Sequence, residues 1–218
     1  MGKEIDLLKR YPKTKRDLKT RLITKSPADR ALARKFGYDF FDGDRKNGYG
    51  GYYYNPRFWN NVVKDFIKFY KLNKNSKILD IGCGKGFMLH DFKQAIPDLT
   101  VRGIDISNYA IKNSLISVKK YLKVGNAKKL DFPDNYFDLA ISVTTLHNLK
   151  LNDFKKSIEE IKRVSKKSFI TVDSYKNELE KKRMDAWNLT ALTYFHRKDW
   201  IKLFKEIDYK GDYFWFIP

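Results

Sequence analysis

The sequence predicts an α/β protein with a Rossmann-like parallel sheet flanked by helices. From Lys77 onward, short apolar segments alternate with amphipathic ones, and this alternation is typical of parallel strands whose two faces are covered by helices. The first strand runs directly into Gly82, Gly84 and Gly86, which favour a tight turn between a strand and a helix. The 218 residues suffice for one such domain with an appendage.

The composition is that of an intracellular chain without a membrane span. No stretch of about eighteen apolar residues occurs, and the start of the chain, MGKEIDLLKR, lacks the apolar region of a secretory signal. The only cysteine is Cys83, so neither an intramolecular disulfide nor a cysteine-based zinc site can form. We therefore expect a cytoplasmic protein without a metal site.

The net charge of +19 raises the question of a nucleic-acid partner, because Lys and Arg clustered on one face release counterions from phosphates. Here the lysines are spread over the whole length, and residues such as Lys155 and Lys162 fit the solvated face of a helix. The abundance of Lys, Asn, Ile, Phe and Tyr also fits A/T-rich codons. The charge by itself is weak support for a nucleic-acid partner.

Residues 1–56 are expected to form an appendage of short helices and a loop, ahead of a domain over residues 57–218. Ser26 and the proline after it suit the start of a helix, and Gly37 suits the position just past its end. The segment 40–56 is rich in glycine and tyrosine and has no apolar period, which predicts a loop that could serve as a lid.

Within the domain, the apolar patterns predict strands that alternate with helices. The expected strands are 77–81, 100–105, 121–125, 137–143, 168–173 and a terminal one at 211–217. The expected helices are 58–70, 87–96, 107–122, 154–164, 178–188 and 198–206. The helix at 107–122 is predicted from Ser107 as its cap and from an apolar face that extends to Leu122.

The glycine turn is the feature that indicates function. Glycines there let the backbone approach a ligand closely, although their spacing differs from the fingerprint of dinucleotide-binding proteins. Asp105 ends the next strand about twenty residues further on, where an acidic residue can accept hydrogen bonds from both ribose hydroxyls of a nucleoside. Two further motifs follow, VGNA at residues 124–127 and FPDNYFD at residues 132–138.

With these four motifs in order, the sequence resembles the class I S-adenosylmethionine-dependent methyltransferases, particularly the branch that includes the ubiquinone and menaquinone biosynthetic enzymes. The resemblance covers about residues 77–173. It implies S-adenosyl-L-methionine as cofactor and S-adenosyl-L-homocysteine as product. That family usually ends its sheet with an antiparallel pair of strands. Only residues 211–217 are clear here, and residues 188–195 could supply the other strand.

The resemblance also implies which residues bind the cofactor. Asp80 would organise the turn and help to bind the ammonium, Asp105 would hold the ribose, and Ile106 would pack on the adenine. The implied set is Asp80, Gly82, Cys83, Gly84, Gly86, Asp105, Ile106, Asn126, Ala127 and Val143. Asn126 stands where the family has Asp, so its bond to the adenine amino group would lose charge assistance. Lys85 stands where small residues are common and is expected to be solvated.

Three residues are candidates for the acceptor side of the reaction. His147 follows the fourth strand, where open α/β sheets bind ligands, so it could be a general base or simply a packing histidine. Tyr49 offers an aromatic face with a polar tip, and Arg45 could clamp a carboxylate or phosphate. The alternative is a surface loop that packs on the helix at 58–70.

The sequence therefore predicts methyl transfer to a small-molecule acceptor, such as a sugar, a nucleotide sugar or a small anionic metabolite, on oxygen or nitrogen. An RNA or protein methyltransferase is the first alternative, favoured by the charge. Base-amino methyltransferases carry Asn/Asp-Pro-Pro-Tyr after the fourth strand, where residues 144–147 read Thr-Thr-Leu-His. A non-catalytic partner with the same fold is the second alternative. The oligomeric state is left open.

Overall fold

The computed structural model describes residues 2–13 and 26–218. It confirms the predicted Rossmann-like parallel sheet flanked by helices. Within these residues, seven strands pair in the order β3-β2-β1-β4-β5-β6, with β7 also beside β5, and every ladder between them is parallel. The strands are β1 (Lys77–Ile81), β2 (Thr100–Asp105), β3 (Leu122–Val124), β4 (Leu139–Val143), β5 (Ser168–Tyr175), β6 (Phe195–His196) and β7 (Asp212–Phe216).

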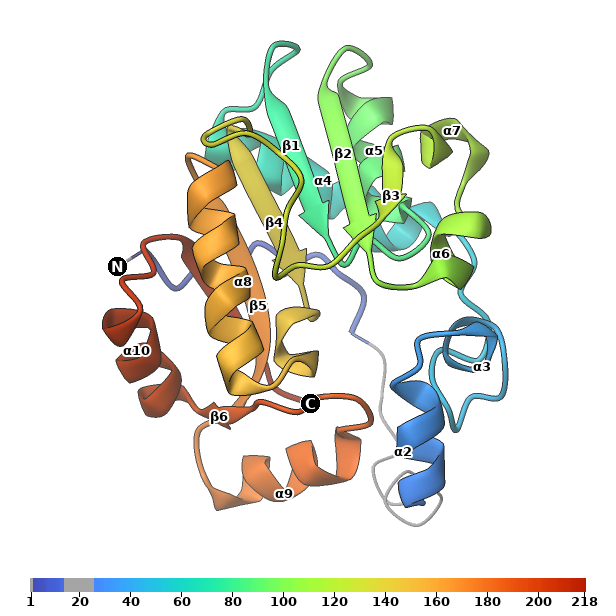
Figure 1. Cartoon of the computed structure of the whole chain (residues 1–218), viewed down its shortest axis with the longest axis vertical. Coiled ribbons are helices and arrows are strands. Elements are labelled where there is room, and N and C mark those ends of the chain that lie inside the picture. Colours follow the sequence, from blue (N-terminus) through green and yellow to red (C-terminus); the bar gives the residue numbers. More distant parts are fainter. Residues whose placement is uncertain (1, 14–25) are drawn as a thin grey trace.

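Helices cover both faces of the sheet, with α8 on one face and α4 and α5 on the other (Figure 1). The described helices are α2 (Pro27–Ala33), α3 (Tyr38–Phe41), α4 (Pro56–Tyr70), α5 (Phe87–Ala95), α6 (Asn108–Lys112), α7 (Ile116–Lys119), the 3-10 turn η1 (Leu146–Asn148), α8 (Leu151–Val164), α9 (Glu178–Trp187) and α10 (Arg197–Glu206). Among them, no helix has the length and apolar character that crossing a lipid bilayer requires.

The core consists of two apolar layers, one on each face of the sheet. Leu79 and Ile170 face the layer that contains α8 and α10, whereas Ile78 and Phe169 face the layer that contains α4 and α5. Neighbouring residues of one strand therefore point to opposite layers, as the two-residue period of a strand requires. This double burial explains why the strands read as nearly continuous apolar runs.

The far edge of the sheet differs from the antiparallel ending that the resemblance implied. β7 pairs in parallel with residues 169–173 of β5. β6 pairs, also in parallel, with the next two residues of β5, Ser174 and Tyr175. Of residues 188–195, only Phe195 lies in a strand. The outer side of β7 is covered by the start of the chain, since Tyr213 donates its N–H to Lys3 O (3.0 Å) and accepts from Ile5 N (2.9 Å).

Residues 3–10 thus lie with the sheet and α4 rather than with residues 26–56 of the predicted appendage. Leu7 is buried in the layer beneath α4, and Arg10 holds Asp65 of α4 through two hydrogen bonds of 2.7 Å. The boundary at residue 56 stays a prediction, but this part of the predicted appendage contacts both β7 and α4.

The predicted helix at 107–122 is wrong in its length. Ser107 caps a helix as expected, accepting from Ala110 N, but the chain forms two short helices, α6 and α7, separated at Leu115. The reason is a tertiary bond: Leu115 leaves the helical path and donates its N–H to the carbonyl of Lys85 at 3.1 Å. Leu122 belongs to β3 instead.

The predicted role of Gly37 is also wrong. α2 ends at Ala33, and the left-handed residue after it is Phe36, with φ +49°. Gly37 instead precedes α3 as its N-cap. The extra turn brings residues 38–41 back toward the carboxyl edge of the sheet, where the loop that follows lies over the glycine turn.

Two phenylalanines of α4, Phe66 and Phe69, offer a matched test of this packing. Phe66 is fully buried, and its ring packs edge-on against those of Phe92 and Phe169. Phe69, on the same helix, is 38% exposed. We expect Phe66→Ala to lower the free energy of unfolding by about 3–5 kcal/mol, because it leaves a cavity. Phe69→Ala is expected to cost less than about 1 kcal/mol. Urea unfolding measures both, and equal losses would contradict the assignment of α4 to the core.

Candidate functional site

The glycine turn joins β1 to α5 at the carboxyl edge of the sheet. Gly82, Gly84 and Gly86 all have left-handed backbones, with φ of +82°, +54° and +80°. At Gly82 a side chain is also excluded by space, because a Cβ there would lie 2.2 Å from the hydroxyl of Thr145. The N–H groups of Gly82 and Cys83 bond the carbonyl of Ile104, which fixes the turn to β2. Because these glycines carry no side chain, a ligand could approach the backbone of the turn closely.

Asp105 is the carboxylate that accepts a hydrogen bond from the glycine turn. One of its oxygens accepts from Gly84 N and the other from Ser107 N, each at 2.8 Å. The residue is 8% exposed, and this burial raises the pKa of its carboxyl. Each carboxylate oxygen retains a second lone pair, so the group can still accept hydrogen bonds from a diol. Ile106, the next residue, is 56% exposed.

Asp80 is a buried carboxylate without a hydrogen-bond partner among the described residues. It is the penultimate residue of β1, two residues before Gly82, and is 4% exposed. Burial, together with the charge of Asp105, raises the pKa of Asp80 to about 8. A buried anion of this kind is costly unless a cation compensates it. The site therefore fits a ligand that carries an ammonium group.

The other residues of the predicted set surround the same edge. Cys83 packs into the layer beneath α4, and burial raises the pKa of its thiol well above the ordinary value, so it is no nucleophile. Asn126 is exposed just after β3, and its side-chain oxygen accepts from Lys128 N at 3.0 Å. Ala127 and Val143 are half-buried. Their cofactor contacts stay a prediction.

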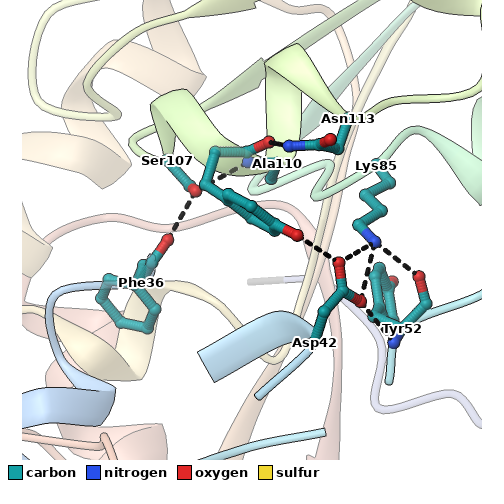
Figure 2. Close-up of polar contacts among 8 residues, drawn as sticks. Phe36, Asp42, Tyr52, Lys85, Ser107, Ala110 and Asn113 are labelled. Atoms are coloured by element: carbon teal, nitrogen blue, oxygen red, sulfur yellow. Dashed lines mark hydrogen bonds and ion pairs between the residues drawn. The ribbon is translucent and has the colours of Figure 1, made fainter. Parts of the chain in front are cut away.

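Lys85 is not solvated, contrary to the sequence-based expectation. It is 5% exposed, and its Nζ donates to both carboxylate oxygens of Asp42 (2.8 and 2.6 Å) and to the carbonyl of Tyr52 (3.0 Å), as Figure 2 shows. The segment that supplies these partners, residues 27–54, we call the lid segment. Its loop lies over the glycine turn and shields the lysine from water.

The lid segment places aromatic rings over the turn. The Tyr52 ring stacks on Phe87 with centroids 4.7 Å apart, and it lies 3.3 Å from the position of a Cβ built on Gly84. Tyr49 packs against Tyr52 at 4.3 Å. Although Tyr49 is 45% exposed, loss of water around its hydroxyl, followed by the proximity of Tyr11 and Asp105, raises its pKa, so its phenol stays protonated and can donate a hydrogen bond.

The lid segment also contacts the opposite side of the site. Arg30 of α2 donates to the carbonyl of Asn188, and Arg34 donates to that of Thr190 at 3.3 Å. Both carbonyls belong to the loop after α9, which lies at the same edge of the sheet as α2 (Figure 1). Arg45 bonds the carbonyl of Gly48, which leaves most of its guanidinium donors available.

His147 is buried in η1, just after β4. Its Nδ1 accepts from Asp173 N at 3.1 Å, and its carbonyl accepts from Leu192 N and Thr193 N, both at 2.9 Å. Burial lowers the pKa of His147 to about 3, so the ring is neutral and carries its proton on Nε2. Its only basic lone pair is thus already engaged. This arrangement favours the packing alternative, and a role as general base stays a prediction.

Sequence reasoning missed Asp42 and Tyr109 as partners of the turn. Tyr109 donates to Asp42 at 2.6 Å, next to Lys85. The one available signal was Lys85 itself, because a long cation inside a buried turn needs a partner. That partner lies 43 residues earlier, in a loop without periodicity.

Comparison with known proteins links this geometry to one family. Residues 79–172 match the family described as Methyltransferase domain. The demethylmenaquinone methyltransferase of Geobacillus stearothermophilus is 30% identical over 161 residues, which are 70% of this chain and 66% of that protein. The tRNA (carboxymethyluridine(34)-5-O)-methyltransferase of Arabidopsis thaliana is 33% identical over 133 residues, 60% of this chain and 31% of that protein.

A solved structure, the YcgJ protein from Bacillus subtilis, superposes with a TM-score of 0.54 at 18% identity, over 66% of each chain, and shows the same fold. The chain spans just under two thirds of the length of the first relative and about a third of the second. The matched range, 79–172, contains Asp80, the glycine turn and Asp105.

The raised pKa of Asp80 predicts how stability depends on pH. Between the ordinary value of 3.8 and about 8, the folded protein holds a proton that the unfolded chain has released. The free energy of unfolding should therefore fall as pH rises, by about 1 kcal/mol per pH unit between about pH 5 and 8. Asp80→Asn should remove this slope, whereas Asp131→Asn, whose side chain is 94% exposed, should keep it. Urea unfolding of the ligand-free proteins tests this, and identical slopes would contradict the burial of an unpaired Asp80.

The role of His147 can be tested without a known acceptor. His147→Leu leaves the N–H of Asp173 without an acceptor, which should cost about 1–3 kcal/mol of folding stability. His147→Asn retains an oxygen near the place of Nδ1 and should recover most of that loss. Urea unfolding compares the two variants. If both lose the same stability, the hydrogen bond to Asp173 is not what His147 contributes.

Proposed function

Because the chain belongs to the class I S-adenosylmethionine-dependent methyltransferases, we propose that it binds S-adenosyl-L-methionine and transfers the methyl group to a small-molecule acceptor. The observation that carries this proposal is the pair of buried carboxylates at the glycine turn. Asp80 has no partner among the described residues, and Asp105 is anchored by two backbone N–H groups. One suits an ammonium and the other a ribose diol.

The cofactor would supply a sulfonium with an activated methyl group. Gly82 and Gly84 would let its methionine part approach the backbone, and Ile106 would cover its adenine. Asn126 would still accept from the adenine, through the lone pair that Lys128 does not use. For such a displacement the protein mainly supplies alignment and excludes water, which suits a site covered by a lid segment.

On the acceptor side, the described residues supply donors and positive charge rather than a base. Tyr49 keeps its proton, and Arg45 has donors free for a carboxylate or phosphate. His147 would act by positioning the ends of β4 and β5. This set favours an acceptor with an anionic group, such as a nucleotide sugar or another small anionic metabolite. An acceptor that is already nucleophilic would need no general base.

A small acceptor is supported by the contacts of the lid segment on both sides of the site. It is held to the glycine turn by Asp42 and to the loop after α9 by Arg30 and Arg34.

RNA methylation is the second candidate, favoured by the net charge of +19 and by the relative that methylates tRNA. Binding to RNA that weakens steeply with salt would support it. A non-catalytic partner role would not need Asp105 at the turn.

Thermal unfolding with S-adenosylmethionine, S-adenosylhomocysteine, NAD and no ligand tests the cofactor. At a hundredfold excess over its dissociation constant, a ligand adds about 2.7 kcal/mol to stability, or about 5–10 °C for a chain of this size. We expect a rise with the two sulfur nucleosides only, and its loss in Asp105→Ala.

Asp98→Ala is the matched control, because Asp98 is exposed near the opposite end of the same strand. It should leave the rise unchanged. No rise in the wild type at concentrations near a millimolar would refute the proposed cofactor and favour the non-catalytic alternative.

A further inference from the structure

A buried ion pair connects the lid segment to the glycine turn. Lys85 lies between Gly84 and Gly86, and its ammonium contacts both oxygens of Asp42 in the loop after α3. The side chains are 6% and 10% exposed. Tyr109 of α6 donates to the same carboxylate, and this bond raises the pKa of Tyr109 to about 12, so it remains a donor. Figure 2 shows the Lys85 ammonium and the backbone of Tyr52 beside the Asp42 carboxylate.

The same carboxylate also sets the position of Tyr52. One oxygen of Asp42 accepts from Tyr52 N at 2.9 Å, while Lys85 bonds the Tyr52 carbonyl. Both backbone groups of Tyr52 are therefore fixed by the ion pair. Its ring lies over Gly84, where the methionine part of a cofactor would approach. Separation of Asp42 from Lys85 would release this ring.

A second contact anchors the lid segment beside Asp105. Ser107, whose N–H bonds Asp105, donates its hydroxyl to the carbonyl of Phe36. Asp42 and Phe36 are thus attached to the two segments that carry the glycine turn and Asp105. The lid segment is therefore fastened to the proposed cofactor site itself, in addition to its contacts with the loop after α9.

We propose that Asp42 is the latch of the lid segment: its ion pair with Lys85 holds the segment closed over the glycine turn, so that S-adenosylhomocysteine leaves and S-adenosylmethionine enters only when the pair separates. Asp42 and Lys85 are positioning residues in this scheme. The inference rests on the proposed function, whose cofactor it assumes.

A buried ion pair suits a latch because its two energy terms nearly cancel. The attraction between the ions is offset by the water that both have lost, and both regain that water on opening. A lid held by apolar contacts has no such compensation, because opening exposes apolar surface to water and costs free energy. Lids of this kind commonly set the rate of product release.

The test measures ligand release and lid opening separately. Labelled S-adenosylhomocysteine is bound to the protein and chased with excess unlabelled ligand, and amide hydrogen exchange of residues 38–54 is followed in the ligand-free protein. Asp42→Asn should speed release at least about tenfold, because it breaks a buried charge pair. Tyr109→Phe removes one hydrogen bond and should speed release about threefold. The Tyr52 amide should exchange faster in both variants.

Asp65→Asn is the matched control, because it breaks an equally short ion pair, with Arg10, on α4. It should change neither quantity. If Asp42→Asn does not fold with Lys85 unpaired, Tyr109→Phe and the double variant Asp42→Asn/Lys85→Met take its place.

Unchanged release and unchanged exchange in folded variants that bind the nucleoside would overturn the latch. Failure of the wild type to bind S-adenosylhomocysteine would refute the proposed function. It would also refute the proposal that Asp42 controls the release and entry of the cofactor. Amide exchange in the ligand-free protein would then still decide whether Asp42 holds the lid segment closed.

Discussion

The hydrogen bond from Gly84 to Asp105 is the contact on which the site depends. It joins the turn after β1 to the end of β2, so the carboxyl ends of these two parallel strands are held together. The left-handed backbone at Gly82, Gly84 and Gly86 is what allows the N–H to point at the carboxylate. Neighbouring elements follow from this geometry, since the break between α6 and α7 occurs where Leu115 bonds the carbonyl of Lys85.

Charge is concentrated where this turn is most enclosed. Asp80 and Asp105 are buried carboxyl groups, and Lys85 is a buried cation that is already neutralised by Asp42. In the ligand-free protein near neutral pH, Asp80 holds a proton, because burial and the charge of Asp105 raise its pKa to about 8. A cationic ligand beside Asp80 would favour its ionised form and lower that pKa. Cofactor binding would therefore be coupled to the ionisation of Asp80.

Contacts between segments distant in sequence complete both the outer edge of the sheet and the surroundings of the site. Residues 3–5 border β7 at the outer edge of the sheet, and the segment after them passes α4 before the lid segment begins. The loop after α9 receives Arg30 and Arg34. The lid segment and the loop after α9, which are far apart in sequence, are thereby held together at the carboxyl edge of the sheet.

The sequence alone determined the fold class, the strands β1 to β5 and the placement of Asp80, the glycine turn and Asp105 at neighbouring strand ends. These depend on local signals: apolar runs, glycines that tolerate left-handed backbone, and an acid at a strand end. Tertiary structure alone decided the parallel direction of β7, the break at Leu115 and the burial of Lys85. Each of these is set by a partner distant in sequence, such as Tyr213 for Lys3 or Asp42 for Lys85. No local pattern encodes such a partner, because loop segments carry no periodicity from which their contacts can be inferred.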